Sequence, residues 1–145
     1  MKVYVAGPIS GKTADETFAY FEGVESRLEA IGFEVLTPMK GKNHLRKEGV
    51  FKPSGYTYPL STNHAIFNRD HWMVSQADVI LVNLLESERV SIGSMFELAW
   101  ASHMDKHVVV VMPEEGIHTH SFVLEAANVI FRSLDEAITY LTELL

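Results

Sequence analysis

Short apolar stretches alternate with amphipathic stretches along the whole chain, and this alternation limits the possible folds more than any other feature. The apolar stretches have the length of β-strands and cover residues 2–6, 34–37, 78–84, 107–112 and a last one near 129. Patterns with the period of a helix cover residues 13–31, 62–76, 91–104, 121–127 and a stretch opened by Ser133. Strands that alternate with helices form a parallel sheet covered on both faces. We therefore expect an α/β fold, in one domain that spans residues 1–145.

Composition excludes several classes of protein. A chain of 145 residues with 47% hydrophobic and 21% charged residues is long enough to bury a core. The absence of cysteine removes disulfides, thiolate nucleophiles and cysteine-based metal sites, and gives no sign of secretion. The first residues resemble a strand rather than a signal peptide, and the apolar runs are too short to cross a bilayer. We expect a cytoplasmic protein with no membrane partner.

The distribution of charge favours a small anion over a polymer. A net charge of −7 argues against a nucleic-acid partner, because most of the surface would repel a phosphate backbone. Five of the twelve cations lie between residues 40 and 52, where only Glu48 opposes them: Lys40, Lys42, Arg46, Lys47 and Lys52. Such a loop can steer a nucleotide to an acidic protein. It is equally well explained as a solvated surface loop.

A parallel sheet of this kind binds ligands at the carboxyl ends of its strands, where the strand order reverses. The segments that follow the first four strands are residues 6–12, 38–61, 85–94 and 113–121. We expect the site to lie among them.

Glu97 is the strongest candidate for a chemical role. It is the only acid between Arg89 and His103, and its neighbours are small or apolar. A carboxylate in such surroundings, shortly after a buried strand, suits a nucleophile. The alternative is an ordinary helix glutamate that pairs with a nearby cation.

The first loop raises a different possibility. Residues 6–13 fit a loose phosphate-binding pattern, with Lys12 as its lysine, between a strand and a helix. Pro8 removes one of the N–H groups that such a loop directs at phosphate, and no later strand ends in an acid suited to Mg²⁺. Mg²⁺-dependent consumption of a nucleoside triphosphate therefore remains a minor alternative.

Three segments together resemble a known family. They are residues 4–9 (YVAGPI), residues 68–70 (NRD) with 76–80 (QADVI), and residues 91–99 (SIGSMFELA). In order and spacing they are similar to the nucleoside 2-deoxyribosyltransferase superfamily, which includes 2'-deoxynucleoside 5'-phosphate N-hydrolases. The resemblance runs from Met1 to about Ala127. It implies a flavodoxin-like (Rossmann-like) α/β/α sandwich with a five-stranded parallel sheet, no cofactor or metal, and a homodimer or higher homo-oligomer with shared active sites.

The resemblance assigns roles to three residues. Glu97 matches the family's nucleophile, Asp70 an acid near the sugar and the leaving base, and Tyr4 a hydroxyl that orients the nucleophile. Asp70 could instead form a surface ion pair, and Tyr4 could be a core residue with a satisfied hydroxyl. By the same resemblance, further substrate contacts fall on Gly7, Pro8, Ile9, Gly93 and Ser94.

Two serines bear on the substrate. Ser91 stands where the hydrolases have serine, which accepts a 5'-phosphate, and where transferases usually have aspartate. A carboxylate would repel a phosphate, whereas a hydroxyl beside a helix N-terminus can donate to it. Ser121 matches a phosphate-binding serine supplied by the neighbouring subunit. Ser91 also fits a helix N-cap, and Pro8 and Ser10 replace a serine and an arginine that bind phosphate in the hydrolases. Lys12 or the basic loop can substitute for that arginine.

These observations lead to a metal-free enzyme that cleaves the N-glycosidic bond of a nucleoside 5'-monophosphate. Charge that builds on the sugar as the bond breaks is stabilised or trapped by a carboxylate below the anomeric carbon. One alternative is a transferase that exchanges bases between deoxynucleosides. A second is a non-catalytic module that binds nucleotides, since fold does not fix function.

Overall fold

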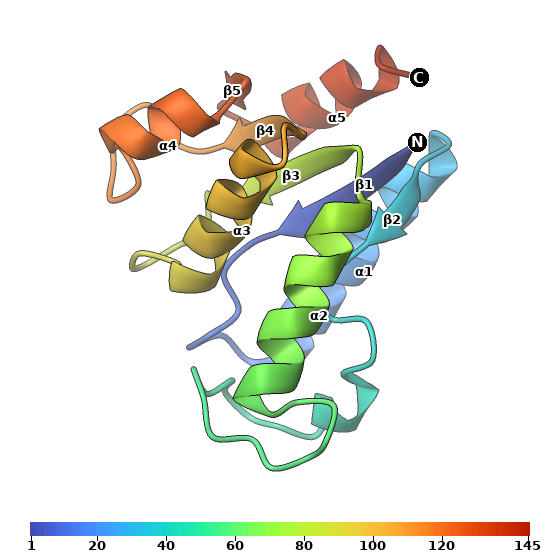
Figure 1. The fold of residues 1–145 in the computed structure, drawn as a ribbon, viewed down its shortest axis with the longest axis vertical. Coiled ribbons are helices and arrows are strands. Elements are labelled where there is room, and N and C mark those ends of the chain that lie inside the picture. The colour runs from blue at the N-terminus through green and yellow to red at the C-terminus, as the bar shows by residue number, and fades with distance from the viewer.

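The computed structural model describes residues 1–145 and contains a five-stranded parallel sheet with helices on both faces (Figure 1). The strands are β1 (Lys2–Ala6), β2 (Glu34–Leu36), β3 (Val79–Asn83), β4 (His107–Val111) and β5 (Val129–Phe131). Their order in the sheet is β2-β1-β3-β4-β5, and every neighbouring pair is parallel. This is the flavodoxin-like order, so the expected fold class is confirmed. The order reverses between β1 and β3, where a ligand crevice is expected.

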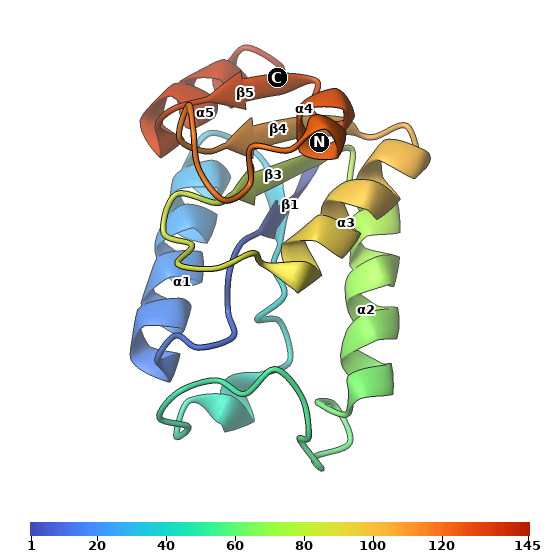
Figure 2. The same cartoon turned by 90° about the vertical axis from the view of Figure 1, so that its left-hand side faces the viewer.

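Alternating side chains of the strands belong to two separate hydrophobic cores, one on each face of the sheet. Val3, Val5 and their neighbours pack against α1 (Ala14–Ala30) and α5 (Leu134–Thr142). On the opposite face, Tyr4 and Ala6 join the core formed with α2 (Asn63–Gln76), α3 (Ile92–His103) and α4 (Ser121–Ala126). Figure 2 shows the two helical layers on either side of the sheet edge. Tyr4 therefore points to the face covered by the helices that carry Asp70 and Glu97.

The helices begin where the sequence indicates. Thr13 with Glu16, and Ser133 with Glu136, form complete capping boxes that satisfy N–H groups at the starts of α1 and α5. The observed boundaries of helices and strands differ from the expected ones by one or two residues. None of the helices combines the length and the apolarity that a membrane span requires.

The segment between β2 and α2 is a loop, as expected, but it is not a free positive surface. It contains a short 3₁₀-helix, η1 (Asn43–Leu45). Lys40 forms an ion pair with Glu25, and Arg46 forms one with Glu22, both on α1. Lys42 is buried. Acidic residues of α1 therefore neutralise two of the five cations and a third is buried, which leaves Lys47 and Lys52 as the exposed cations of the loop without an ion pair.

Candidate active site

A pocket of about 900 Å³ opens at the carboxyl ends of the strands. The segments after β1, β2 and β3 all line it, together with residues of α2 and α3, as expected. The segment after β4 does not, which corrects the expectation that residues 113–121 belong to the site of their own chain. β4 lies one strand further from the point where the order reverses, and the loop that follows it lines a separate small pocket of about 220 Å³.

The predicted substrate-binding residues divide into two groups. Those that line the large pocket, beside Asp70 and Glu97, are Gly7, Pro8, Ile9, Ser91, Gly93 and Ser94. Ser121 does not line it and lies exposed at the start of α4. A single chain therefore leaves Ser121 outside the pocket.

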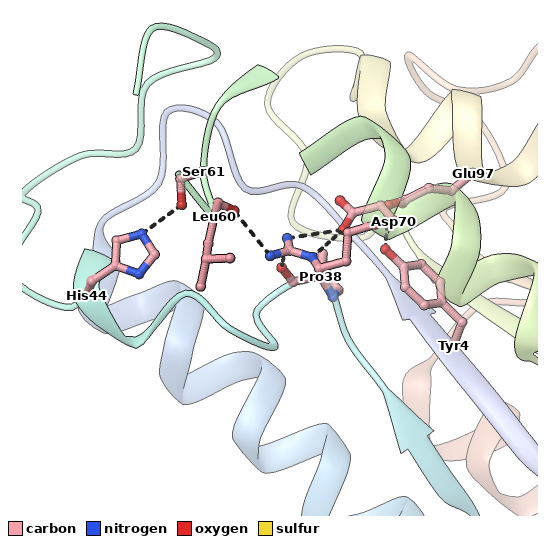
Figure 3. Close-up of polar contacts among 8 residues, drawn as sticks. Tyr4, Pro38, His44, Leu60, Ser61, Asp70 and Glu97 are labelled. Atoms are coloured by element: carbon pink, nitrogen blue, oxygen red, sulfur yellow. Dashed lines mark hydrogen bonds and ion pairs between the residues drawn. The ribbon is translucent and has the colours of Figure 1, made fainter. Parts of the chain in front are cut away.

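Tyr4 and Glu97 form a short buried hydrogen bond beside the pocket. The Tyr4 hydroxyl donates to Glu97 Oε1 over 2.6 Å, between β1 and α3 (Figure 3). Tyr4 is 0% exposed and Glu97 is 7% exposed. Glu97 takes part in no ion pair, so the alternative of a surface glutamate paired with a cation is wrong. The hydrogen bond from Tyr4 fixes one carboxylate oxygen of Glu97 and leaves the other oxygen free for a different partner.

Burial controls the protonation of this pair. It raises the pKa of Glu97 to about 8, with a further increase from the negative charge of Asp70. The hydrogen bond from Tyr4 and the positive charge of Lys42 act in the opposite direction. Burial also raises the pKa of Tyr4 well above its usual value, so its hydroxyl remains a donor at neutral pH.

Asp70 is the second carboxyl group of the pocket. It is 8% exposed and pairs with Arg69, whose Nη2 lies 3.2 Å from Asp70 Oδ1. Arg69 also donates to the carbonyl of Pro38 over 3.3 Å, which ties α2 to the end of β2 (Figure 3). Burial raises the pKa of Asp70, while Lys42 and Arg69 oppose the increase. Two carboxyl groups with raised pKa values suit a site that holds one of them protonated and one ionised.

The start of α3 presents unused hydrogen-bond donors to the pocket. The N–H groups of Ile92, Gly93 and Ser94 have no acceptor, as at any uncapped helix start. Ser91 occupies the N-cap position, as expected, but its side chain does not cap the helix. Its Oγ instead donates to Ser94 Oγ over 2.8 Å. This first turn can receive an anion.

His118 holds Ser91 in place, a contact that the sequence did not indicate. The Ser91 N–H donates to His118 Nε2 over 3.1 Å, and the His118 side chain is buried. Burial lowers the pKa of His118, which favours the neutral imidazole that this bond needs. A lone histidine in a long loop carries no pattern that predicts such a contact.

At the start of α1, by contrast, most of the donors that could bind a phosphate are already used. The Gly11 N–H bonds to Phe51 O, the Ala14 N–H to Gly49 O, and the Lys12 N–H to Ile9 O. The Lys12 ammonium donates to the carbonyl of Glu86 over 2.8 Å. Because these donors are already used, the structure does not favour a phosphate-binding loop of the nucleoside triphosphatase type at residues 6–13.

Arg89 is a second residue that sequence reasoning missed. It lines the pocket next to the start of α3 and forms no ion pair. A Cβ atom on Gly11 would lie 2.5 Å from Arg89 Nη2, so this glycine allows the guanidinium to lie against the first loop. Arg89 is therefore a free cation beside the unused donors of α3.

Comparisons with known proteins agree with this architecture. The family model described as nucleoside 2-deoxyribosyltransferase matches residues 3–131. Among solved structures, a 2-deoxyribosyltransferase from Bacillus psychrosaccharolyticus has a TM-score of 0.70 at 17% identity, over 97% of this chain and 92% of that chain. A CMP N-glycosidase from Clostridium botulinum has a TM-score of 0.61 at 19% identity, over 100% of both chains.

A 2-deoxyribosyltransferase from Leishmania mexicana has a TM-score of 0.61 at 18% identity, over 98% of this chain and 97% of that chain. At sequence identities of 17%, 19% and 18%, the similarity to these three structures shows a shared fold. A comparison with curated protein sequences finds no match.

Proposed function

The chain belongs to the nucleoside 2-deoxyribosyltransferase family and is an enzyme, an N-glycosidase or a deoxyribosyltransferase, and we propose that it hydrolyses the N-glycosidic bond of a nucleoside 5'-monophosphate. The observation that carries this proposal is the buried bond between Tyr4 and Glu97 beside a pocket that also contains Asp70. Family membership removes the non-catalytic alternative.

In the proposed mechanism Glu97 is the nucleophile. Its free carboxylate oxygen attacks the anomeric carbon, while the electron pair of the C1'–N bond leaves with the base. Asp70 donates the proton that the departing base requires. Water then attacks the anomeric carbon of the glycosyl ester and gives a proton to Asp70, which releases the sugar phosphate and restores both carboxyl groups. The Tyr4 hydroxyl keeps the carboxylate oriented and favours its ionised form, since a hydrogen bond from Tyr4 lowers the pKa of Glu97.

A 5'-phosphate is favoured by the first turn of α3. The free N–H groups of Ile92, Gly93 and Ser94 and the positive end of the helix suit a dianion. Arg89 supplies the adjacent positive charge. In our proposal it replaces the arginine that the related hydrolases carry at the position of Ser10, because Lys12 is already bonded to a main-chain carbonyl.

We also propose that the active enzyme is a homo-oligomer, with the site completed by Ser121 of a second subunit. Ser121 begins α4, and the next residue, Phe122, is 80% exposed. Ile92 and Phe96 on α3 are exposed as well. Exposed apolar residues on two helices that contact each other, α3 and α4, are typical of a subunit contact.

A substrate panel tests the proposal. The protein is incubated with nucleosides and with their 5'-monophosphates, with and without an acceptor base, and free base is measured by chromatography. We expect base release from monophosphates, at a rate that an acceptor base does not change, and no release by Glu97→Ala. Base exchange among free nucleosides would instead support the deoxyribosyltransferase alternative.

A further inference from the structure

Lys42 is a buried cation that the proposed mechanism does not use. Lys42 is 5% exposed, and no other lysine or arginine is buried to this degree. The ammonium group takes part in none of the ion pairs of the structure, and the hydrogen bonds of Lys42 involve its main chain only. Lys42 lines the pocket, where the negative charges of Asp70 and Glu97 attract its ammonium group without bonding to it. Its donors are therefore free for a partner that arrives with the substrate.

The loop holds Lys42 at the pocket from both sides. The Lys42 N–H donates to Met39 O over 3.1 Å, and Lys42 O accepts from Leu45 N over 2.8 Å as η1 begins. Lys40 and Arg46, on either side, are paired with glutamates of α1. The position of Lys42 is therefore fixed by the main chain and by its neighbours.

Lys42 lines the pocket from a different segment than the start of α3. β1 lies between β2 and β3, so the segments that follow β2 and β3 flank the end of β1 from opposite sides. Lys42 follows β2, whereas Arg89 and Ser91 follow β3. The charged groups that act on Lys42 are Asp70, Arg69 and Glu97. In our proposal Asp70 protonates the base, and Lys42 lines the same pocket within reach of the charge of Asp70, so it belongs to the part of the pocket that receives the base.

We infer that the Lys42 ammonium is a further catalytic group, which donates a hydrogen bond to the base at the acceptor atom conjugated with the glycosidic nitrogen. This inference rests on the proposed function. An ammonium group has three donors and no acceptor, so it recognises the oxygen or nitrogen on which negative charge collects. In a pyrimidine that atom is the 2-oxo oxygen, and in a purine it is a ring nitrogen.

The electron balance requires no additional reactant. As Glu97 bonds to the anomeric carbon, the pair from the C1'–N bond moves onto the base, where Lys42 stabilises the charge and keeps its own protons. Asp70 then supplies the proton. Lys42 thus lowers the barrier to cleavage of the glycosidic bond when the base is a poor leaving group. When the leaving group is good, Lys42 has little effect on this barrier.

Binding of the separated products tests the inference without any turnover. The ligands are 5-nitrouracil and 8-azaguanine, a pyrimidine and a purine that are anionic at mildly alkaline pH, and 2-deoxyribose 5-phosphate. For Lys42→Met, titration calorimetry should show a loss of roughly tenfold or more in affinity for at least one anionic base, and less than a twofold change for the sugar phosphate. The base whose affinity falls shows whether the hydrogen-bond acceptor belongs to a pyrimidine or to a purine.

Lys47→Met is the matched control, because it removes the same charge from the same exposed loop outside the pocket. A loss of affinity for the sugar phosphate, or no change for either base, would overturn the inference. These outcomes are independent of the substrate panel, so failure of the proposed function and failure of this inference can be told apart.

Kinetics give the second readout. For Lys42→Met, kcat on a monophosphate with a natural base should fall roughly 100-fold, in the range of a group that assists the leaving base. On the 4-nitrophenyl glycoside of the same sugar phosphate, whose leaving group needs no assistance, kcat should fall less than fivefold. Equal losses on both substrates would contradict the inference. A large decrease in the Tm of Lys42→Met would show a structural role instead.

Discussion

At the scale of single residues, the proposed mechanism makes the protonation of Glu97 the main determinant of activity. Its pKa is raised to about 8, and only the ionised carboxylate can attack the anomeric carbon. We therefore expect kcat/KM to increase with pH up to about 8. Burial raises the pKa of Asp70 as well, and the negative charge of Asp70 raises the pKa of Glu97, so the two carboxyl groups compete for one proton. In the proposed mechanism the active form is the one that carries this proton on Asp70.

Tyr4→Phe and Asp70→Asn should move the rising part of this pH profile in opposite directions. Tyr4 lowers the pKa of Glu97 through its hydrogen bond, so its removal should shift the midpoint to higher pH. Asp70 raises the pKa of Glu97 by its charge, so Asp70→Asn should shift the midpoint to lower pH, although the rate falls. Profiles of kcat/KM between pH 6 and 9.5 check both signs. Shifts in the same direction would show that the rise does not report Glu97.

The raised pKa of Glu97 also predicts that the ionised form, which is the active one in our proposal, is the less stable form of the folded protein. A carboxyl group whose pKa rises on folding stabilises the folded state while it is protonated. That stability is lost as pH increases from the unfolded pKa, near 4.5, through about 8. One pKa unit corresponds to about 1.4 kcal/mol, so the ionised Glu97 destabilises the protein by up to several kcal/mol.

Glu97→Gln should accordingly be inactive and yet more stable than the wild type at pH 8.5. At pH 5, where Glu97 is protonated in the folded protein, the two should unfold at similar temperatures. Differential scanning calorimetry at both values provides the measurement. Equal Tm differences at pH 5 and pH 8.5 would be inconsistent with a buried, raised-pKa carboxyl group.

At the scale of secondary structure, the N-termini of α1 and α3 differ in whether their N–H groups can bind a ligand. At α1 the N–H groups of Ala14 and Glu16 are bonded within the protein, whereas the first N–H groups of α3 are open to the pocket. Both starts looked suitable for phosphate in the sequence. The difference arises from the loop between β2 and α2, whose residues Gly49 and Phe51 accept bonds from Ala14 and Gly11. No local pattern of the first loop encodes a partner so distant in the chain.

Arg89→Met tests the phosphate site at α3. It should raise KM for nucleoside 5'-monophosphates roughly tenfold or more, because a free guanidinium beside the first turn is lost. Activity on the corresponding nucleosides should change less than twofold, and Lys47→Met should leave both substrates unaffected. Steady-state kinetics with each pair of substrates measure this. A similar rise in KM for nucleosides would place Arg89 elsewhere in the mechanism.

The elements themselves were predictable to within one or two residues, because apolar periodicity and capping residues are local signals. Glu97, Asp70 and Tyr4 could be singled out because each lies in a segment similar to a known family. Lys42 and Arg89 could not, since their positions depend on how long loops fold. Lys42 in particular looked like one of five equivalent loop cations, and only its burial distinguishes it.

At the scale of the whole molecule, the pocket and the exposed apolar residues occupy connected parts of one face. Phe67, Phe96 and Trp100 line the pocket and contact one another edge to face. Phe122 on α4 is largely exposed. Under our proposal a second subunit covers this surface and delivers Ser121, so assembly and catalysis depend on each other.

Phe122→Asp should therefore dissociate the oligomer and raise KM for monophosphates. A buried charge without a partner is costly at an interface, whereas an exposed one is tolerated. Light scattering coupled to size-exclusion chromatography reports the mass, and assays above and below the dissociation concentration report the kinetics. The wild type being a fully active monomer would exclude a shared site.

The most direct test of the account is to trap the glycosyl-enzyme. A nucleoside 5'-monophosphate with fluorine at C2' of the sugar slows both chemical steps, because fluorine destabilises positive charge on the ring. With an activated base the first step still proceeds, and mass spectrometry of the intact protein and of its peptides locates the adduct. We predict one sugar phosphate attached to Glu97 together with one equivalent of released base. An adduct on Asp70, or base release without any covalent intermediate, would contradict the role of Glu97 as the nucleophile.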